Sequence, residues 1–269
     1  MSTPDPSQDL ADRGYTVVRG VLDPVEVEYA RERCGRLLSG AGAKELTTSG
    51  FLAEEFLAGI VLRDRVLAAV RMAVGPSAVL YPSCTARKDI YVPWHVDSAF
   101  TGPGAAYVWE PGFAHVQCGL YLQDNTPETG GGIDVVRASH LMAFDGYGRL
   151  PADFETAAHT VGASSLCETV DTRAGDLVVW HARLLHRSTV ALGEPRGEKF
   201  GVFFSYAREH LRDNHRFLCR IAEDSVRTMN GVSRTVPRLA EIARLRYPAD
   251  FPAWFVKEAE HAGTKVVTL

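Results

Sequence analysis

The feature that most constrains the fold is a series of short apolar segments between residues 77 and 207. Each is rich in Val, Ile, Leu, Tyr, Phe or Trp, and turns containing Gly, Pro, Asn or Asp separate them: AVLYP, DIYVPWHVD, HVQCGLYLQD, IDVVR, DLVVWHA and FGVFFSYA. Short segments of this kind with frequent turns are typical of antiparallel sandwiches and barrels. We therefore expect a mainly β fold with a barrel core over about residues 77–207.

The segment 115–123 indicates how such a barrel is filled. Side chains alternate between the two faces of a strand. One face here is apolar and is expected to pack in the core: Val116, Cys118, Leu120 and Leu122. The other face is expected to line a wetter lumen: His115, Gln117, Gly119, Tyr121 and Gln123.

Helical signals flank the barrel segments on both sides. Asp23 suits an N-cap, and Glu26 completes a capping box with it. A second helical stretch is expected over residues 52–74, with a break near Asp64, and the chain becomes helical again after residue 206. The barrel is thus expected to carry N- and C-terminal helical additions.

Composition narrows the functional class. A net charge of −4 gives no basic excess for nucleic acid or anionic membranes, and no apolar stretch reaches the length of a membrane span. The polar N-terminus lacks the features of a signal peptide, and the five cysteines form no CxxC pair, so we expect a cytoplasmic protein. We expect one domain over residues 1–269, acting on a small-molecule substrate; the sequence does not indicate an oligomeric state.

The sequence Trp94-His95-Val96-Asp97 contains the sharpest chemical signal. In a strand, residues two apart point the same way, so His95 and Asp97 are expected to project together. An imidazole and a carboxylate on one face provide two of the three ligands of the facial triad of non-haem iron(II) oxygenases. The HxD pattern alone is weak, and a third ligand is required.

His186 is the candidate third ligand. It follows the turn at Gly175 and the segment LVVWHA, and it shares a strand face with Ser188, whose hydroxyl is expected beside the metal ligand. Arg196 and Lys199 then flank the turn into the last strand. A cation at that turn can bind the far carboxylate of a dicarboxylate cosubstrate.

Taken together, these motifs resemble the phytanoyl-CoA dioxygenase family, which includes ectoine hydroxylase. The resemblance rests on WHVD, on the Gly-rich turn before an SH dipeptide in NTPETGGGIDVVRASH, and on GD with a histidine ten residues after the Asp. It covers about residues 79–207, and residues 15–38 also resemble the family's N-terminal strand and helix. It implies a double-stranded β-helix (a jelly-roll, cupin-like barrel) that uses iron(II), 2-oxoglutarate and O2.

Carried over position by position, the resemblance makes His95, Asp97 and His186 the iron ligands, which are also the catalytic residues. Ser188 matches a position that contacts 2-oxoglutarate, and Gln117, on the lumen face, is a further candidate contact.

The residue that binds the distal carboxylate of 2-oxoglutarate has two candidates. Spacing from His186 favours Arg196, whereas counting back from Tyr206 favours Lys199. The turn between the strands is longer than is usual in the family. We therefore retain both, with a narrow preference for Arg196.

The other histidines are expected to be structural. His181 precedes His186 by five residues and so faces the opposite way on a regular strand. His115 is expected to be a hydrogen-bonded barrel residue, with contact to cosubstrate or substrate as the alternative. His140 lies in Arg-Ala-Ser-His where the family has Pro-Gly-Ser-His, and we expect it not to bind metal. The remainder are expected at the surface: His159, His210, His215 and His261.

Three aromatic residues follow the HxD motif and have two interpretations. Phe100, Trp109 and Phe113 can form a lid over the active site, or they can simply pack. Three cations are expected to be solvated by default, with contact to an anionic substrate group as the alternative: Lys88, Arg149 and Arg183.

The resemblance implies hydroxylation of an unactivated C–H bond in a small molecule, with release of succinate and CO2. An amino-acid derivative or a specialised-metabolite intermediate is the expected substrate. The carboxylate of Asp97 argues against halogenation, whereas desaturation, epoxidation and cyclisation remain alternatives to hydroxylation. Two other classes are a metal-dependent cupin-type isomerase or lyase without oxygen chemistry, and a non-catalytic small-molecule-binding barrel.

Overall fold

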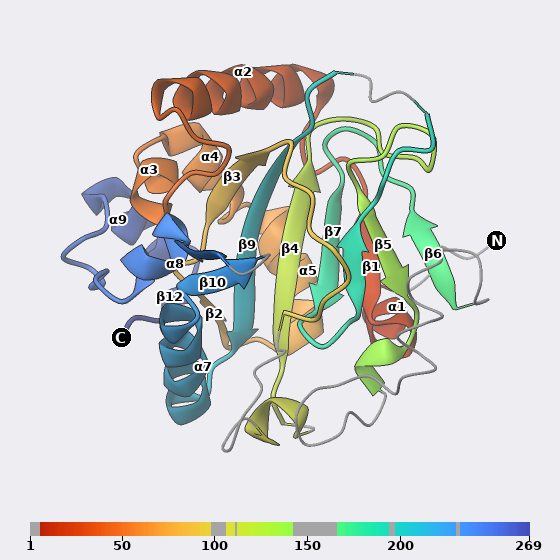
Figure 1. Cartoon of the computed structure of the whole chain (residues 1–269). Coiled ribbons are helices and arrows are strands. Elements are labelled where there is room, and N and C mark those ends of the chain that lie inside the picture. The colour runs from red at the N-terminus through yellow and green to blue at the C-terminus, as the bar shows by residue number, and fades with distance from the viewer. Residues whose placement is uncertain (1–5, 98–105, 111, 142–165, 194–196, 230–231) are drawn as a thin grey trace.

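The structure, a computed structural model, describes residues 6–97, 106–110, 112–141, 166–193, 197–229 and 232–269. Two β-sheets form the centre of the molecule, and helices surround the larger sheet (Figure 1). None of the helices in these ranges is long and apolar enough to cross a membrane.

Seven of the described strands form the larger sheet. Their spatial order is β1-β7-β4-β9-β2-β12, with β3 also paired to β9, and all pairs are antiparallel except β2 with β12. The strands are β1 Tyr15–Val18, β2 Ala78–Leu80, β3 Thr85–Lys88, β4 His115–Tyr121, β7 Leu177–His181, β9 Phe200–Arg208 and β12 Lys265–Val266.

The smaller sheet contains three described strands in the order β6-β5-β8: β6 Cys167–Val170, β5 Ile133–Val136 and β8 His186–Ser188. The chain passes from the larger sheet to the smaller one after β4, and again between β7 and β8. Side chains from both sheets pack together between them, including Val135 and Val178, with Leu184 of the connection between β7 and β8. This confirms the expected double-stranded β-helix with flanking helices.

The outer face of the larger sheet is covered by helices, with α5 contacting β2, β4, β7 and β9. The helices before the barrel are α1 Pro6–Arg13, α2 Pro24–Gly40, α3 Thr48–Leu52, α4 Glu55–Ile60 and α5 Asp64–Val74. Those after it are α7 Leu211–Glu223, α8 Pro237–Ile242 and α9 Ala253–His261, and two short 3-10 turns are η1 Ala106–Trp109 and η2 Ser139–Leu141.

Several local predictions are confirmed. Asp23 and Glu26 form a reciprocal capping box at the start of α2. The second helical stretch is broken before Asp64, and it has one further break between α3 and α4. Val116, Cys118, Leu120 and Leu122 belong to the core beneath the helices, as the alternation in β4 predicts.

One segment differs from its prediction. Residues 89–97 were expected to be a strand, but within them only His95 forms a β-bridge, and the strand β3 lies just before them. Pro93 has no N–H to donate, and Asp89 has φ of 50°, outside the extended region, so a regular ladder is interrupted. A hairpin was also not expected: β10 Val226–Met229 pairs with β11 Val232–Thr235.

Candidate metal centre

His95 and His186 are brought together by their backbones. His95 N–H donates to the carbonyl of His186 at 2.9 Å, and His186 N–H donates to the carbonyl of His95 at 3.0 Å. The pairing continues where Ser188 N–H donates to the Val92 carbonyl and Val92 N–H donates to Ser188 Oγ. The segment before Asp97 is therefore held against β8, although it is not a regular strand, and the two imidazole centroids lie 4.2 Å apart.

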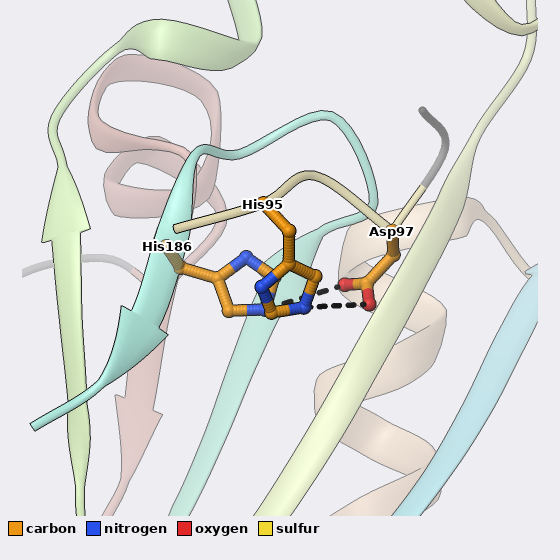
Figure 2. A group of neighbouring side chains, drawn as sticks. All are labelled: His95, Asp97 and His186. Carbon is orange, nitrogen blue, oxygen red and sulfur yellow. Dashed lines mark ion pairs between the residues drawn. The ribbon is translucent and has the colours of Figure 1, made fainter. Parts of the chain in front are cut away.

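Hydrogen bonds also fix which ring nitrogen of each histidine is free. Nδ1 of His95 lies 2.8 Å from the Pro93 carbonyl, and Nδ1 of His186 lies 2.9 Å from the Leu184 carbonyl. A carbonyl can only accept, so each Nδ1 carries the proton and each Nε2 keeps its lone pair. Both Nε2 atoms face Asp97, at 3.7 Å from Oδ1 for His95 and 3.6 Å from Oδ2 for His186 (Figure 2).

The distances from the two Nε2 atoms to the Asp97 carboxylate are long for direct hydrogen bonds, and they suit a cation bound between the three side chains. The ligand atoms of His95, Asp97 and His186 all lie within 4.8 Å of one another. Within the described ranges, no other group of three or more His, Cys, Asp and Glu side chains is placed to hold a metal ion. Two imidazoles and one carboxylate match the donor set of a facial triad, so the residues fit a divalent iron.

The charges of the cluster support the same assignment. Burial lowers the pKa of His186 to about 4, with a further contribution from the neighbouring His95, so this ring is neutral at pH 7. Burial alone would raise the pKa of Asp97, but His186, His95 and Trp180 together hold it well below its usual range. The cluster therefore presents an ionised carboxylate with a neutral His186, which is the protonation state that a metal requires.

Trp180 contacts the cluster directly and was not identified from the sequence. Its indole Nε1–H donates to Asp97 Oδ2 at 2.9 Å, and its ring centroid lies 5.2 Å from that of His186. Trp180 pairs with Gln117 across β4 and β7, so it shares the lumen face already predicted for Gln117. The missing information was the register between two strands that are far apart in sequence.

The cluster opens into a cavity that several predicted residues also line. His95, Asp97 and His186 lie in its wall together with Gln117 and Ser188. The cavity has a volume of about 160 Å³ and is open to solvent on one side.

A second cavity adjoins the first. Ser188, Gly131 and Tyr121 line both, whereas Lys199 lines only the second. The structure therefore places Lys199 beyond Ser188 as seen from the metal ligands. Arg196, the other candidate for the distal carboxylate, lies outside the described residues.

His115 differs from its prediction. The ring is fully buried and stacks on Tyr81 with centroids 4.9 Å apart, and neither ring nitrogen has a hydrogen-bond partner within the described residues. The prediction of a hydrogen-bonded barrel residue is therefore wrong. Phe217 covers the ring edge-on at 4.3 Å, which separates His115 from the cavity that Phe217 lines.

The other two histidines near the barrel lie away from the cluster, as predicted. His181 accepts a hydrogen bond from the backbone of Arg183 through Nδ1, and His140 Nε2 lies 3.1 Å from the Ala11 carbonyl. Of the surface predictions, His210, His215 and His261 are exposed, and His159 is outside the described residues.

The structure decides some of the alternatives that the sequence left open for the aromatic residues and the cations. Phe113 packs against Tyr107 and Phe217, which favours packing over a lid. Lys88 pairs with Glu198, and Arg183 is half-buried, not fully solvated. Phe100, Arg149 and the side chain of Trp109 lie outside the described residues.

The fold and the cluster together define a class: jelly-roll proteins whose barrel carries a two-histidine, one-carboxylate metal centre. The chain belongs to the phytanoyl-CoA dioxygenase (PhyH) family, whose model matches residues 10–193. No curated protein matches the sequence closely enough to add a more specific relative.

Solved structures share this fold at low sequence identity. HygX from Streptomyces hygroscopicus, with nickel and 2-oxoglutarate bound, is 21% identical, with 78% of this chain and 89% of that chain covered and a TM-score of 0.61. The α-ketoglutarate-dependent epimerase SnoN from nogalamycin biosynthesis is 20% identical over 75% and 79%, with a TM-score of 0.59. EctD from S. alaskensis with bound iron is 16% identical over 75% of each chain, with a TM-score of 0.57.

Proposed function

We propose that this protein is an iron(II)- and 2-oxoglutarate-dependent oxygenase that hydroxylates an unactivated C–H bond of a small molecule, releasing succinate and CO2. The observation that carries the proposal is the pair of fixed Nε2 lone pairs facing Asp97 at the wall of a cavity. Structures of similar fold contain iron, or nickel with 2-oxoglutarate, which supports the choice of metal and cosubstrate.

In this proposal His95, Asp97 and His186 hold the iron. Iron(II) with 2-oxoglutarate and O2 would supply the oxidation of the C–H bond. The carbonyls of Pro93 and Leu184 keep the two imidazoles in the tautomer that leaves Nε2 free, so the protein maintains the ligands before the metal arrives.

Ser188 and Lys199 are proposed to hold the cosubstrate. Ser188 lines both cavities, and the stem of Lys199 crosses Gly131, where an added Cβ would lie 2.8 Å from Lys199 Cδ. A dicarboxylate that begins at the metal and passes Ser188 would reach the Lys199 ammonium in the adjoining cavity. We therefore assign the distal carboxylate to Lys199, and Gln117 to the metal end.

The reaction outcome has a second candidate. Two structures of similar fold are named as an epimerase and a carbocyclase, so rearrangement of the substrate after C–H oxidation is the alternative to hydroxylation. Mass analysis of the product separates them, because hydroxylation adds one oxygen atom whereas epimerisation leaves the mass unchanged and ring closure removes two hydrogens.

Anaerobic titration tests the proposal. Iron(II) and 2-oxoglutarate should give a weak visible charge-transfer band in the wild type and in H261A, a variant of an exposed histidine on α9, whereas H95A should lack it. Succinate should then form only with O2. Absence of the band from the wild type would contradict the proposal, and turnover without O2 would indicate the isomerase or lyase class.

A further inference from the structure

Away from the metal ligands, two arginines in the wall of the same cavity share one carboxylate. Arg87 Nε donates to Glu45 Oε1 at 2.7 Å, and Arg238 Nε donates to the same oxygen at 3.0 Å. Arg238 Nη1 also donates to the Ser83 carbonyl at 2.8 Å. These residues come from β3, α8 and the segment before α3, so the arrangement exists only in the folded chain.

In this cluster two guanidinium groups share one carboxylate. Burial would raise the pKa of Glu45, but the two guanidinium groups lower it overall, so Glu45 is ionised at neutral pH. Arginine stays protonated under any physiological condition. All three side chains are largely buried, with exposed fractions of 25% for Arg87, 13% for Arg238 and 20% for Glu45.

Arg87 is oriented to receive a further acceptor. Its Nε is held by Glu45, and its guanidinium carbon lies 5.0 Å from the ring centroid of Phe203, which together fix the plane of the group. Within the described residues, its two terminal amino groups make no hydrogen bond. A guanidinium fixed in this way presents two parallel donors, the geometry that recognises a carboxylate or a phosphate.

We propose that Arg87 and Arg238 bind a carboxylate of the substrate, so that the substrate is a small organic acid with an apolar body. The proposal rests on the proposed function, because it assigns the cavity to a substrate that lies beside the metal centre. The apolar body of the substrate would contact Phe217, Ile221 and Leu239 of α7 and α8, which line the same cavity.

A monocarboxylate fits this wall better than a phosphate. The Arg87–Glu45–Arg238 cluster supplies one net positive charge, and Asp224, which also lines the cavity, adds a negative one. A phosphate dianion would meet this acidic residue with too little compensation. The wall also favours acids over cationic molecules, because the two guanidinium groups repel an ammonium placed against them.

The distal carboxylate of 2-oxoglutarate has the same chemistry and must be distinguished from that of the substrate. Lys199 lines only the second cavity and Arg238 lines only the first, whereas Arg87 lines both. Substitution of Arg238 should therefore leave 2-oxoglutarate affinity unchanged, whereas substitution of Lys199 should lower it.

Calorimetry on the protein loaded with nickel(II) and 2-oxoglutarate tests the inference without turnover. The probes are two matched pairs: 4-phenylbutanoate with its primary amide, and N-acetyl-L-leucinate with its primary amide. We expect at least one acid to bind about tenfold more tightly than its amide, the effect of one charge-assisted hydrogen bond. R87Q and R238Q should remove this preference.

Two further variants act as controls. K88Q changes a cation that is next to Arg87 on β3 and pairs with Glu198 instead, so it should keep the preference. R238K retains the charge and should restore part of the preference lost in R238Q, even if R238Q also lowers the melting temperature.

The inference would be overturned by equal affinities of acid and amide in both pairs, by absence of binding by all four probes, or by a preference that survives in both R87Q and R238Q. A loss of 2-oxoglutarate affinity in R238Q as large as that in K199Q would also overturn it, because the carboxylate would then be that of the cosubstrate. Failure of the wild type to bind 2-oxoglutarate would instead contradict the proposed function.

Discussion

Trp180 and Asp97 are joined by a hydrogen bond of 2.9 Å from the indole Nε1–H to Oδ2. Trp180 is on β7 of the larger sheet, whereas Asp97 follows a segment held against the smaller sheet. The bond thus links the two sheets at the candidate metal centre. It also occupies Oδ2 with a donor, which leaves Oδ1, 3.7 Å from His95 Nε2, as the less constrained oxygen.

Loss of this bond is expected to weaken metal binding without unfolding the protein. W180F keeps an aromatic ring in place but removes the donor, and loss of such supporting bonds typically costs about tenfold or more in metal affinity. Competition with a chelator, measured under anaerobic conditions with iron(II), gives the dissociation constant. W254F, in α9 beside Phe255, should leave it unchanged. An unchanged constant in W180F would show that Asp97 is positioned without the indole.

Replacement of Lys199 is expected to act on the cosubstrate alone. K199Q removes the proposed partner of the distal carboxylate, and a hydrogen bond to a charged group contributes about 1.5–3 kcal/mol, so 2-oxoglutarate should bind at least about tenfold more weakly. Metal affinity should not change. The charge-transfer band, titrated against 2-oxoglutarate, measures the effect, with K88Q as the control. A normal affinity in K199Q would return the assignment to Arg196.

The buried His115 is expected to make the fold sensitive to acid. Burial lowers the pKa of His115 from 6.5 to about 3. Because the unfolded chain binds a proton at this residue between those values and the folded chain does not, the free energy of unfolding is greatest above about pH 6.5 and falls as the pH decreases toward 3.

H115F should reduce this sensitivity, because phenylalanine retains the stacking on Tyr81 without the titrating nitrogens. Between pH 7.5 and 5 the wild type should lose about 2 kcal/mol more than H115F, since each unit of pKa difference corresponds to about 1.4 kcal/mol. Urea unfolding at the two pH values measures both. The variant retains a smaller loss, because the pKa of His181 and that of His186 are also lowered by burial. Parallel pH profiles would contradict the prediction.

Two glycines should respond to alanine in opposite ways. Gly175 has φ of 90°, and a Cβ there would lie 2.3 Å from the Leu22 carbonyl oxygen, so G175A should lower the free energy of unfolding by about 2 kcal/mol or more. Gly59 lies in α4 with nothing within 4 Å of the added atom, so G59A should raise it by about 0.5–1 kcal/mol. Chemical denaturation at constant pH measures both, and equal effects would contradict the argument.

The parts of the fold that were predictable are those with local causes. The capping box of Asp23 and Glu26 and the alternation of β4 depend only on residues close together in the sequence, and both are confirmed. The segment 89–97 was assigned to a strand on composition alone. Its conformation depends on Pro93 and on its pairing with β8, which lies about ninety residues later in the chain.

The candidate site likewise contains residues that the sequence predicts and residues that it does not. His95, Asp97 and His186 were identified from motif order, and the structure brings them together. Trp180 and the Arg87–Glu45–Arg238 cluster were not identified, because they depend on strand register and on the contacts of Glu45 with both β3 and α8. Residue types alone do not encode such contacts, since Arg and Glu are most often solvated.

The reciprocal backbone hydrogen bonds between His95 and His186 bear on how the protein acquires and regains its proposed metal. Because the sheet itself sets the spacing of the two imidazoles, we expect little ordering of these two side chains when the proposed metal binds. Under the proposed function, we expect iron lost by oxidation or to a competing chelator to be replaced without refolding. Newly made chains can likewise mature before iron is supplied, so iron supply would limit activity but not the amount of folded protein.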